Sequence, residues 1–412
     1  MKLRIHFAQT PQDRKLYSNH LPMIIGLLLF AMIAVFVGFN ERTPAPLGLQ
    51  APVDLFSARR AYATLHSIYL HNDPHPTGSL AQQRIGDRIM DYFRKLGYTP
   101  ELQEVLAADR STSTCAIVRN IILRYQGVHD GPGILVSAHY DSVPCGEGGM
   151  DDGSGTATIL ELARILRRAP RPQRTIVFLL TDGEEIGLLG AKAFIEHSSE
   201  ENKISTVIGI DSGGDGGRSR VTQITGDEAL LTKVLSRPAN APSGSSAIGS
   251  LLDLFHLTEG TSDFEEFKKT GKTGINLVNS TWNFRRHTPE DQIEAINLGT
   301  LQDHGVRALS LIRRLSGVKQ VYSKQGKMVF FDLLGMIFIH YAPLWAWILQ
   351  GASYILNGLV WKRCGFNKPL NVISLLAKWL AVIAAGTVGG GLAGYIVVNL
   401  PQMPFLLRPA LI

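Results

Sequence analysis

Histidine and carboxylate residues gather at three places where apolar runs of the sequence end. His139 follows one such run, the pair Asp151-Asp152 stands in a glycine-flanked turn after it, and the pair Glu184-Glu185 follows a second run. Imidazole and carboxylate groups are the ligands that zinc and related divalent cations use in proteins. Because rigid strands hold the groups at their ends in fixed positions, the pattern predicts a two-metal hydrolase site.

Each motif also has an ordinary structural explanation when it is taken alone. A histidine at a strand end is more often structural, an acidic turn is usually solvated, and Asp151-Asp152 suits the start of a helix with Ser154 as its N-cap. Two adjacent carboxylates beside glycines nevertheless favour a cation. Two neighbouring free carboxylates, as in Glu184-Glu185, repel each other, which raises one pKa and suits a general base.

Three more polar residues extend the candidate site. Asp141, two residues after His139, is positioned to accept a hydrogen bond from the free ring nitrogen of a metal-bound imidazole. Asp211 ends the apolar run 207–210, and His287 lies just before a helix predicted over 292–315. With the earlier residues they supply two histidines and three carboxylates as ligands, enough to hold two metal ions with one carboxylate bridging.

Taken in order, these motifs resemble the zinc aminopeptidases of the M28 family. The resemblance covers roughly Asp54 to Gly317 and rests on H-Y-D, D-D-G-S-G, E-E-x-G-L-x-G, I-D-S and R-H-T-x-x-D; P-H-P-T-G-S at 74–79 is similar to a segment of membrane-bound members. One motif departs from the family, because Ser262-Asp263-Phe264 stands where members commonly have S-D-H. This leaves the side-chain preference open, and Asp263 either lines the site or caps a helix.

The resemblance implies a role for each candidate residue. Asp151 would bridge two zinc ions, with His139 and Asp211 completing one site and Glu185 and His287 the other. Glu184 would be the general base, Asp141 the partner of His139, and the peptide bond between Asp151 and Asp152 would be cis. The expected function is that of a membrane-anchored metalloprotease, an aminopeptidase with two Zn²⁺ per chain that hydrolyses N-terminal residues from peptides.

Three alternatives remain beside that function. A glutaminyl-cyclase-like transferase has a similar fold but uses one zinc, and a carboxypeptidase is a second enzyme on the same fold. A catalytically inactive, membrane-tethered binding module is the third. The complete set of five ligands argues against the first and the last.

Apolar runs alternating with helical patterns predict the fold. Helices are expected over 57–69, 79–96 and 154–168, and strands over 115–125, 133–138, 175–180 and 206–210. Such alternation favours a largely parallel sheet covered on both faces, with chemistry at the carboxyl ends of its strands. Like the zinc aminopeptidases, the domain is expected to be an α/β three-layer sandwich with a mixed, mostly parallel central sheet.

Composition and charge indicate a membrane protein and exclude some other classes. The chain has 412 residues, long enough for one large domain with accessory segments, and its 18% of charged residues lies below the ~25% typical of soluble domains. The net charge of +6 is scattered and no nucleic-acid-binding motif is present. Three cysteines exclude a disulfide framework but leave a Cys115–Cys145 bond open. Asn279-Ser280-Thr281 is a glycosylation sequon, relevant only in a eukaryotic secretory compartment.

Long apolar segments flank the expected domain at 53–318. We expect a cytoplasmic N-terminus over 1–20, a transmembrane anchor at 21–39, a linker at 40–52, transmembrane helices at 328–361 and 371–400 joined by a basic cytoplasmic loop at 362–370, and a tail at 401–412. A signal peptide is the alternative for 21–39, and a buried helical hairpin for the two later segments. This topology places the domain outside the cytoplasm, as on the periplasmic side of a bacterial inner membrane.

Overall fold

The computed structural model describes most of the chain between residues 42 and 363. The described residues are 24, 25, 28, 32, 42–70, 73–110, 113–212, 216–236, 243–244, 262–281, 285–318, 326–333 and 337–363. The chain divides into one unit over 1–343 and a second over 344–412. Each unit is described by itself.

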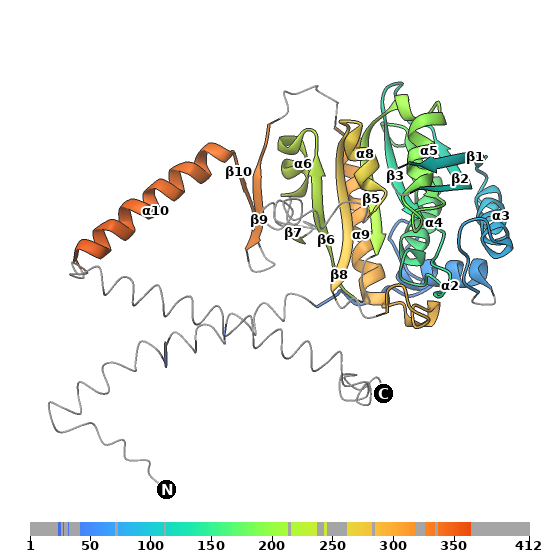
Figure 1. The fold of residues 1–412 in the computed structure, drawn as a ribbon, viewed down its shortest axis with the longest axis horizontal. Coiled ribbons are helices and arrows are strands. Elements are labelled where there is room, and N and C mark those ends of the chain that lie inside the picture. Colours follow the sequence, from blue (N-terminus) through green and yellow to red (C-terminus); the bar gives the residue numbers. More distant parts are fainter. Residues whose placement is uncertain are drawn as a thin grey trace, which may run out of the picture. The chain divides into compact units, whose positions relative to one another are not determined.

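The first unit is built on an eight-stranded sheet with the order β1-β2-β4-β3-β5-β8-β6-β7 (Figure 1). Strand β3 lies between β4 and β5, and β8 follows β5, all four running parallel. Strands β1 and β2 extend one edge in antiparallel fashion, while β6 pairs antiparallel with β8 and parallel with β7. The strands are β1 (Glu101–Asp109), β2 (Thr114–Tyr125), β3 (Gly133–His139), β4 (Ile176–Thr181), β5 (Ile204–Ser212), β6 (Gly216–Thr225), β7 (Ser243–Gly244) and β8 (Thr273–Thr281).

Helices cover both faces of this sheet because successive strand residues alternate between two apolar cores. Ile134 and Val136 of β3 pack into the larger core, whereas Leu135 between them packs into the smaller one. The larger core lies under α2 (Ala58–Tyr69), α3 (Leu80–Lys95), α4 (Gly153–Arg168), α6 (Glu228–Leu235) and α9 (Leu298–Ser316). The smaller lies under α5 (Leu189–His197) and α8 (Phe264–Lys269). The predicted α/β fold with a mixed central sheet is confirmed.

Polar side chains begin the helices that the sequence predicted. Ser57 accepts a hydrogen bond from the backbone of Arg60 at the start of α2, and Ser79 does the same for Gln82 in α3. The predicted cap of α4 is wrong. Asp152, not Ser154, accepts the bond from the backbone N–H of Gly155, at 2.9 Å, because Ser154 is already within the helix and donates back to a carbonyl.

The four predicted strands lie within two residues of β2, β3, β4 and β5. The helix predicted over 292–315 is instead divided into a short 3₁₀ turn, Ile293–Ala295, and α9. Asn297 separates them, because its side chain accepts a hydrogen bond from Thr300 N and starts a new helix there.

The continuous transmembrane helix predicted over 328–361 is wrong. Its first part is an antiparallel hairpin of β9 (Val329–Leu333) and β10 (Ile337–Tyr341), and helix α10 spans Pro343–Arg363. Aromatic and β-branched residues favour the hairpin, where the rings of Phe330 and Phe338 stack with centroids 5.7 Å apart. Proline at the first helical position then suits a new helix start.

Among the described residues, no helix combines the length and the hydropathy that a membrane crossing requires. The predicted spans at 21–39 and 371–400 lie, apart from residues 24, 25, 28 and 32, outside the described residues. So do 1–20, 364–370 and 401–412, which include most of the predicted cytoplasmic loop.

The structure also bears on the glycosylation sequon and on the Cys115–Cys145 bond. Asn279 of the sequon is fully buried on β8 between β5 and β6, where a glycan has no room in the folded domain. Cys115 and Cys145 are both free and exposed, so the disulfide is not formed.

Candidate metal centre

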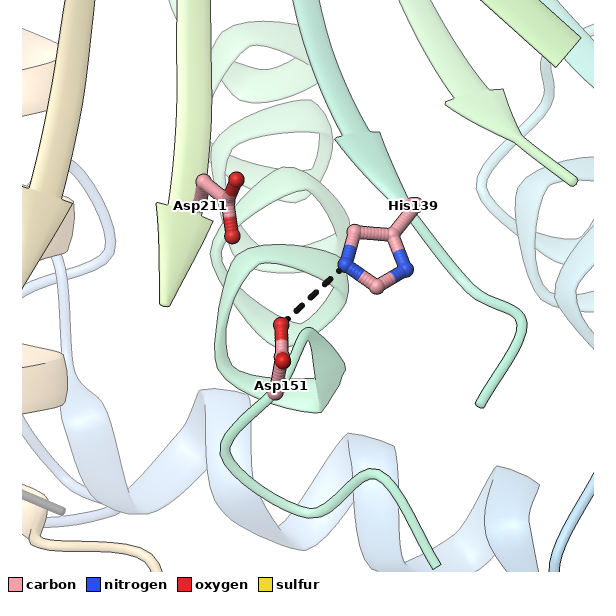
Figure 2. A group of neighbouring side chains, drawn as sticks. All are labelled: His139, Asp151 and Asp211. Atoms are coloured by element: carbon pink, nitrogen blue, oxygen red, sulfur yellow. Dashed lines mark hydrogen bonds and ion pairs between the residues drawn. The ribbon is translucent and has the colours of Figure 1, made fainter. Parts of the chain in front are cut away.

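The candidate ligands meet at the carboxyl ends of the parallel strands. His139 is the last residue of β3 and Asp211 lies next to the end of β5, while Asp151 stands in the turn that enters α4 (Figure 2). Glu184 and Glu185 follow β4, whose last residue pairs with His139. The topology therefore brings residues from four segments to one edge of the sheet, as the sequence predicted.

Two groups of three potential ligands share Asp151. His139, Asp151 and Asp211 form one, and Asp151, Glu185 and His287 form the other, with the ligand atoms of each group within 4.8 Å of one another. Asp151 Oδ1 lies 3.3 Å from His139 Nε2, and its Oδ2 lies 3.2 Å from His287 Nε2, which is 3.0 Å from Glu185 Oε2. A carboxylate that turns one oxygen to each group has the geometry of a bridge.

The side chains of these groups suit bound cations. His139, Asp151, Glu184 and Asp211 are all buried, and Glu185 Oε1 is a buried oxygen without a hydrogen-bond partner among the described residues. Burying several carboxylates is costly unless positive charge or hydrogen bonds compensate them. Imidazole with carboxylate oxygen is a zinc-type ligand set, so the residues present fit zinc.

The pKa values of Glu184 and His139 are both raised in this site, where negative charge is buried. Burial raises the pKa of Glu184 well above its usual range, and the neighbouring charges of Asp211, Asp263 and Glu185 add to this effect. Burial alone would lower the pKa of His139, yet Glu184 and the neighbouring aspartates hold it well above its ordinary value. A dication that takes the place of these protons relieves the repulsion between carboxylates.

Asp141 connects the ligands of both groups through the backbone. Its Oδ1 accepts the N–H of Glu184 and its Oδ2 the N–H of Glu185, each at 3.2 Å. The ring nitrogen Nδ1 of His139 lies 3.1 Å from the carbonyl oxygen of Asp141 and 3.4 Å from its Oδ1. Asp141 is therefore next to His139 as predicted, but its carboxylate bonds mainly to the loop after β4.

Comparisons with known proteins agree with this geometry. A model described as Peptidase family M28 matches residues 120–312. The chain contains a peptidase family M28 domain. The resemblance that the motifs indicated is thereby confirmed.

Curated relatives of the M28 domain are named vacuolar membrane proteases. The one from Candida dubliniensis is 31% identical over 55% of this chain and 25% of its own length, and the one from Schizophyllum commune is 29% identical over 81% of this chain and 38% of its own. The chain thus spans well under half the length of these two relatives.

Solved structures share the fold at low sequence identity. A Zn-dependent exopeptidase from Parabacteroides distasonis matches with a TM-score of 0.51 at 20% identity, covering 64% of this chain and 99% of that one. A glutaminyl cyclase from Porphyromonas gingivalis matches with a TM-score of 0.51 at 21% identity, covering 64% of this chain and 98% of that one. A zinc aminopeptidase from Bacillus subtilis also matches with a TM-score of 0.51, at 18% identity, covering 62% of this chain and 95% of that one. The fold alone therefore does not separate these activities.

Asp291 is a residue of the M28 domain whose role the sequence did not reveal. Its Oδ1 accepts the N–H of Met150 at 2.7 Å and its Oδ2 the N–H of Asp151 at 3.2 Å. Asp291 lies four residues after His287 in R-H-T-P-E-D. Its hydrogen bonds therefore connect the turn that carries Asp151 to the segment that carries His287. The peptide bond between Asp151 and Asp152 is cis, as the resemblance implied.

Asp263 lines the inner side of the centre rather than capping α8 through its side chain. It is buried and hydrogen-bonded to the Thr181 hydroxyl, and with His139 and Asp211 it surrounds a void of about 10 Å³. Burial raises the pKa of Asp263 to about 6. Phe264, which replaces the histidine of the S-D-H motif, is fully buried beside the same void.

Arg286 is the second residue that the sequence reasoning missed. Its Nε lies 2.6 Å from Asp151 Oδ2, and its side chain is 25% exposed. Its sequence signal was its place as the first residue of the R-H-T-x-x-D motif, directly before His287. A permanently charged group thus contacts the shared carboxylate from the side where His287, 43% exposed, faces solvent.

Proposed function

We propose that the M28 domain is a di-zinc aminopeptidase that hydrolyses N-terminal residues from peptides. The observation that carries the proposal is the position of Asp151, whose two oxygens each face a different histidine. His139 and Asp211 would complete one metal site with Asp151, and Glu185 and His287 would complete the other. The zinc-dependent names of proteins with this fold support the choice of metal.

Glu184 is the proposed general base. When bound, the zinc ions supply Lewis acidity that makes a water molecule more acidic and polarises the peptide carbonyl. Glu184 Oε2 lies 3.9 Å from His139 Nε2, so this carboxylate borders the metal groups while the same loop supplies Glu185 as a ligand. In this role the Glu184 carboxylate accepts a proton from the attacking water and then donates that proton to the leaving amine.

An aminopeptidase is favoured over other peptidases by the charge of the surrounding side chains. Glu184 and Asp263 are buried carboxylates beside the ligands, and they attract the α-ammonium group of a peptide rather than its carboxylate. Arg286 is the specific observation in favour of a carboxypeptidase, because it places a cation at the same centre. Hydrolysis of C-blocked but not N-blocked dipeptides is the outcome expected here, and the reverse would indicate a carboxypeptidase.

A glutaminyl-cyclase activity is the second candidate, because a cyclase shares the fold. Metal analysis distinguishes the two, since the proposal requires close to two zinc ions per chain. An inactive binding module is disfavoured by the completeness of the ligand set, as such a protein has no reason to keep five ligands and a base together.

Glu184→Gln tests the mechanism directly. The amide keeps the size of the side chain but accepts protons poorly, so we expect hydrolysis of aminoacyl-nitroanilides to fall by roughly 10²- to 10⁴-fold. Glu184 also lies with His139 and Glu185 in a third group of potential ligands, but the proposal gives it the role of base and not of ligand, so zinc content should remain that of the wild type. Glu196→Gln, at an exposed glutamate, is the matched control. Full activity of the Glu184 variant would refute the assignment of the base.

We further propose that the chain is held at a membrane, with the domain outside the cytoplasm. The names of the curated relatives support membrane association. Helix α10 is consistent with it, because large apolar side chains such as Trp347, Ile348 and Ile355 are exposed on the helix. Retention of the full chain in membranes after alkaline washing, and its release by detergent, is the expected result.

A further inference from the structure

A positive side chain already contacts the carboxylate oxygen that one of the two metal groups needs. Asp151 Oδ2 lies 2.6 Å from Arg286 Nε and 3.2 Å from His287 Nε2. The other oxygen, Oδ1, points to His139 Nε2 at 3.3 Å. The two ends of the shared carboxylate therefore differ in what faces them.

This contact is electrostatically strong. Burial alone would lower the pKa of Arg286, but the charge of Asp151 beside it more than reverses that effect, with Asp211 and Glu184 adding to it. Burial would likewise raise the pKa of Asp151, yet its hydrogen bonds to the two histidines and the charge of Arg286 keep it well below its usual range. A guanidinium group keeps its charge at any working pH.

We propose that Arg286 is a resident cation that weakens the metal site of Glu185 and His287 relative to that of His139 and Asp211. The inference rests on the proposed two-metal function. An ion entering between Glu185 and His287 has to use Asp151 Oδ2, and it meets the guanidinium at that oxygen. At Oδ2 the ion must displace a hydrogen bond from a permanently charged guanidinium, whereas at Oδ1 it displaces only the hydrogen bond to His139, whose ring then becomes a ligand.

The surroundings of Arg286 allow the displacement without a backbone change. Its side chain is one quarter exposed, so the guanidinium has a path toward solvent. The backbone, in contrast, is held by a turn in which Thr288 donates both its N–H, at 3.0 Å, and its hydroxyl, at 2.7 Å, to the carbonyl oxygen of Arg285. The two metal sites therefore fill in order, and Arg286 sets the zinc concentration at which the second becomes occupied.

Zinc titration of the metal-free full-length protein tests this inference without an activity assay. Isothermal titration calorimetry in the presence of a competing chelator gives the affinity of each equivalent. Removal of the charge in Arg286→Gln should tighten the weaker equivalent by roughly tenfold to a hundredfold, the worth of a hydrogen bond between charged groups. The tighter equivalent should change little. Arg286→Lys should keep the second site weak because it retains the charge, and Arg285→Gln is the control for a neighbouring arginine.

The outcomes separate the inference from the function on which it rests. Two equivalents in every variant, with the weaker affinity unchanged in Arg286→Gln, would overturn the role of Arg286 and leave the two-metal function standing. A single equivalent in both the wild type and Arg286→Gln would refute the two-metal function itself. A second equivalent that is weak in the wild type and in Arg286→Lys, and tight in Arg286→Gln, supports the inference.

Discussion

Asp141 shows how a single residue positions several others in this domain. It accepts the backbone N–H groups of Glu184 and Glu185, so it fixes the proposed base and one proposed ligand at once. In Asp141→Asn, one of the two accepting oxygens becomes an NH₂ group that faces an N–H donor. We expect a loss of roughly 10- to 100-fold in zinc affinity or in activity, as for other partners of metal ligands.

Zinc titration and steady-state kinetics of Asp141→Asn measure the two effects separately. Asp91→Asn, at an exposed aspartate on α3, provides the control because its carboxylate pairs with Arg94 on the surface. Unaltered zinc affinity together with unaltered activity would show that the loop after β4 holds its shape without Asp141.

Residues at strand ends were predictable, whereas contacts between distant segments were not. His139, Asp151, Glu184, Glu185 and Asp211 could be found because apolar runs mark the strands that end beside them. Arg286 and Asp291 make their contacts across 135 and 140 residues, respectively. The R-H-T-x-x-D motif contains both residues but does not indicate their distant partners, because only the folded topology brings those segments together.

At the scale of elements, the segment 73–79 before α3 contacts the loop that follows β3 at the candidate metal centre. The backbone N–H of His75 donates to the Ser142 hydroxyl at 2.9 Å, and the Thr77 hydroxyl donates to Asp141 Oδ2 at 3.3 Å. This explains why P-H-P-T-G-S accompanies the ligand motifs: it packs against the loop that follows His139. Among the candidate site residues, Thr77 contacts Asp141 through this hydrogen bond.

Thr77→Val removes that hydroxyl while keeping the branched shape of the side chain. Loss of one long hydrogen bond is worth about 1 kcal/mol, so we expect kcat to fall by roughly fivefold with little change in KM. The effect should be smaller than that of Asp141→Asn. Thr99→Val, at an exposed position, should leave the kinetics unchanged. A rise in KM at constant kcat would mean instead that Thr77 contacts substrate.

The sequence missed β1 and the hairpin of β9 and β10 because their polarity does not follow their burial. Strand β1 is mostly exposed or half-exposed, with Glu101, Gln103 and Glu104 in its first half, so only a short apolar run at 105–108 marks it. The hairpin of β9 and β10 was missed for the opposite reason, because its largely apolar sequence, interrupted by Asp332 and His340, resembles a membrane helix. Periodicity identifies buried central strands well, and it fails where polarity no longer follows burial.

The stability of the whole molecule should depend on pH through two buried histidines. His304 of α9 is 1% exposed, and neither of its ring nitrogens has a hydrogen-bond partner in the part of the chain that the structure describes. Burial lowers the pKa of His304 to about 4, against the opposing charge of Asp303, and burial also lowers the pKa of His75 to about 4. The folded domain thus keeps both rings neutral where the unfolded chain would protonate them.

The direction of the pH effect follows from proton binding. An unfolded histidine has a pKa of about 6.5, so between that pH and about 4 the unfolded chain binds a proton that folded His304 does not. Stability is therefore complete above the unfolded pKa and declines as the pH falls toward 4. From pH 7 to pH 5 the loss amounts to about 2 kcal/mol for each such histidine.

His304→Leu should remove its share of this loss, since leucine fills a similar volume and does not titrate. Urea unfolding of the metal-free protein in detergent at pH 7 and pH 5 measures the effect, because metal ligands would otherwise add their own pH dependence. The free energy of unfolding should fall by about 2 kcal/mol less in the variant than in the wild type. His129→Leu, at an exposed histidine, should behave like the wild type. If His304→Leu loses as much stability as the wild type on acidification, the ring is hydrogen-bonded or hydrated in solution, and acid destabilisation arises elsewhere in the molecule.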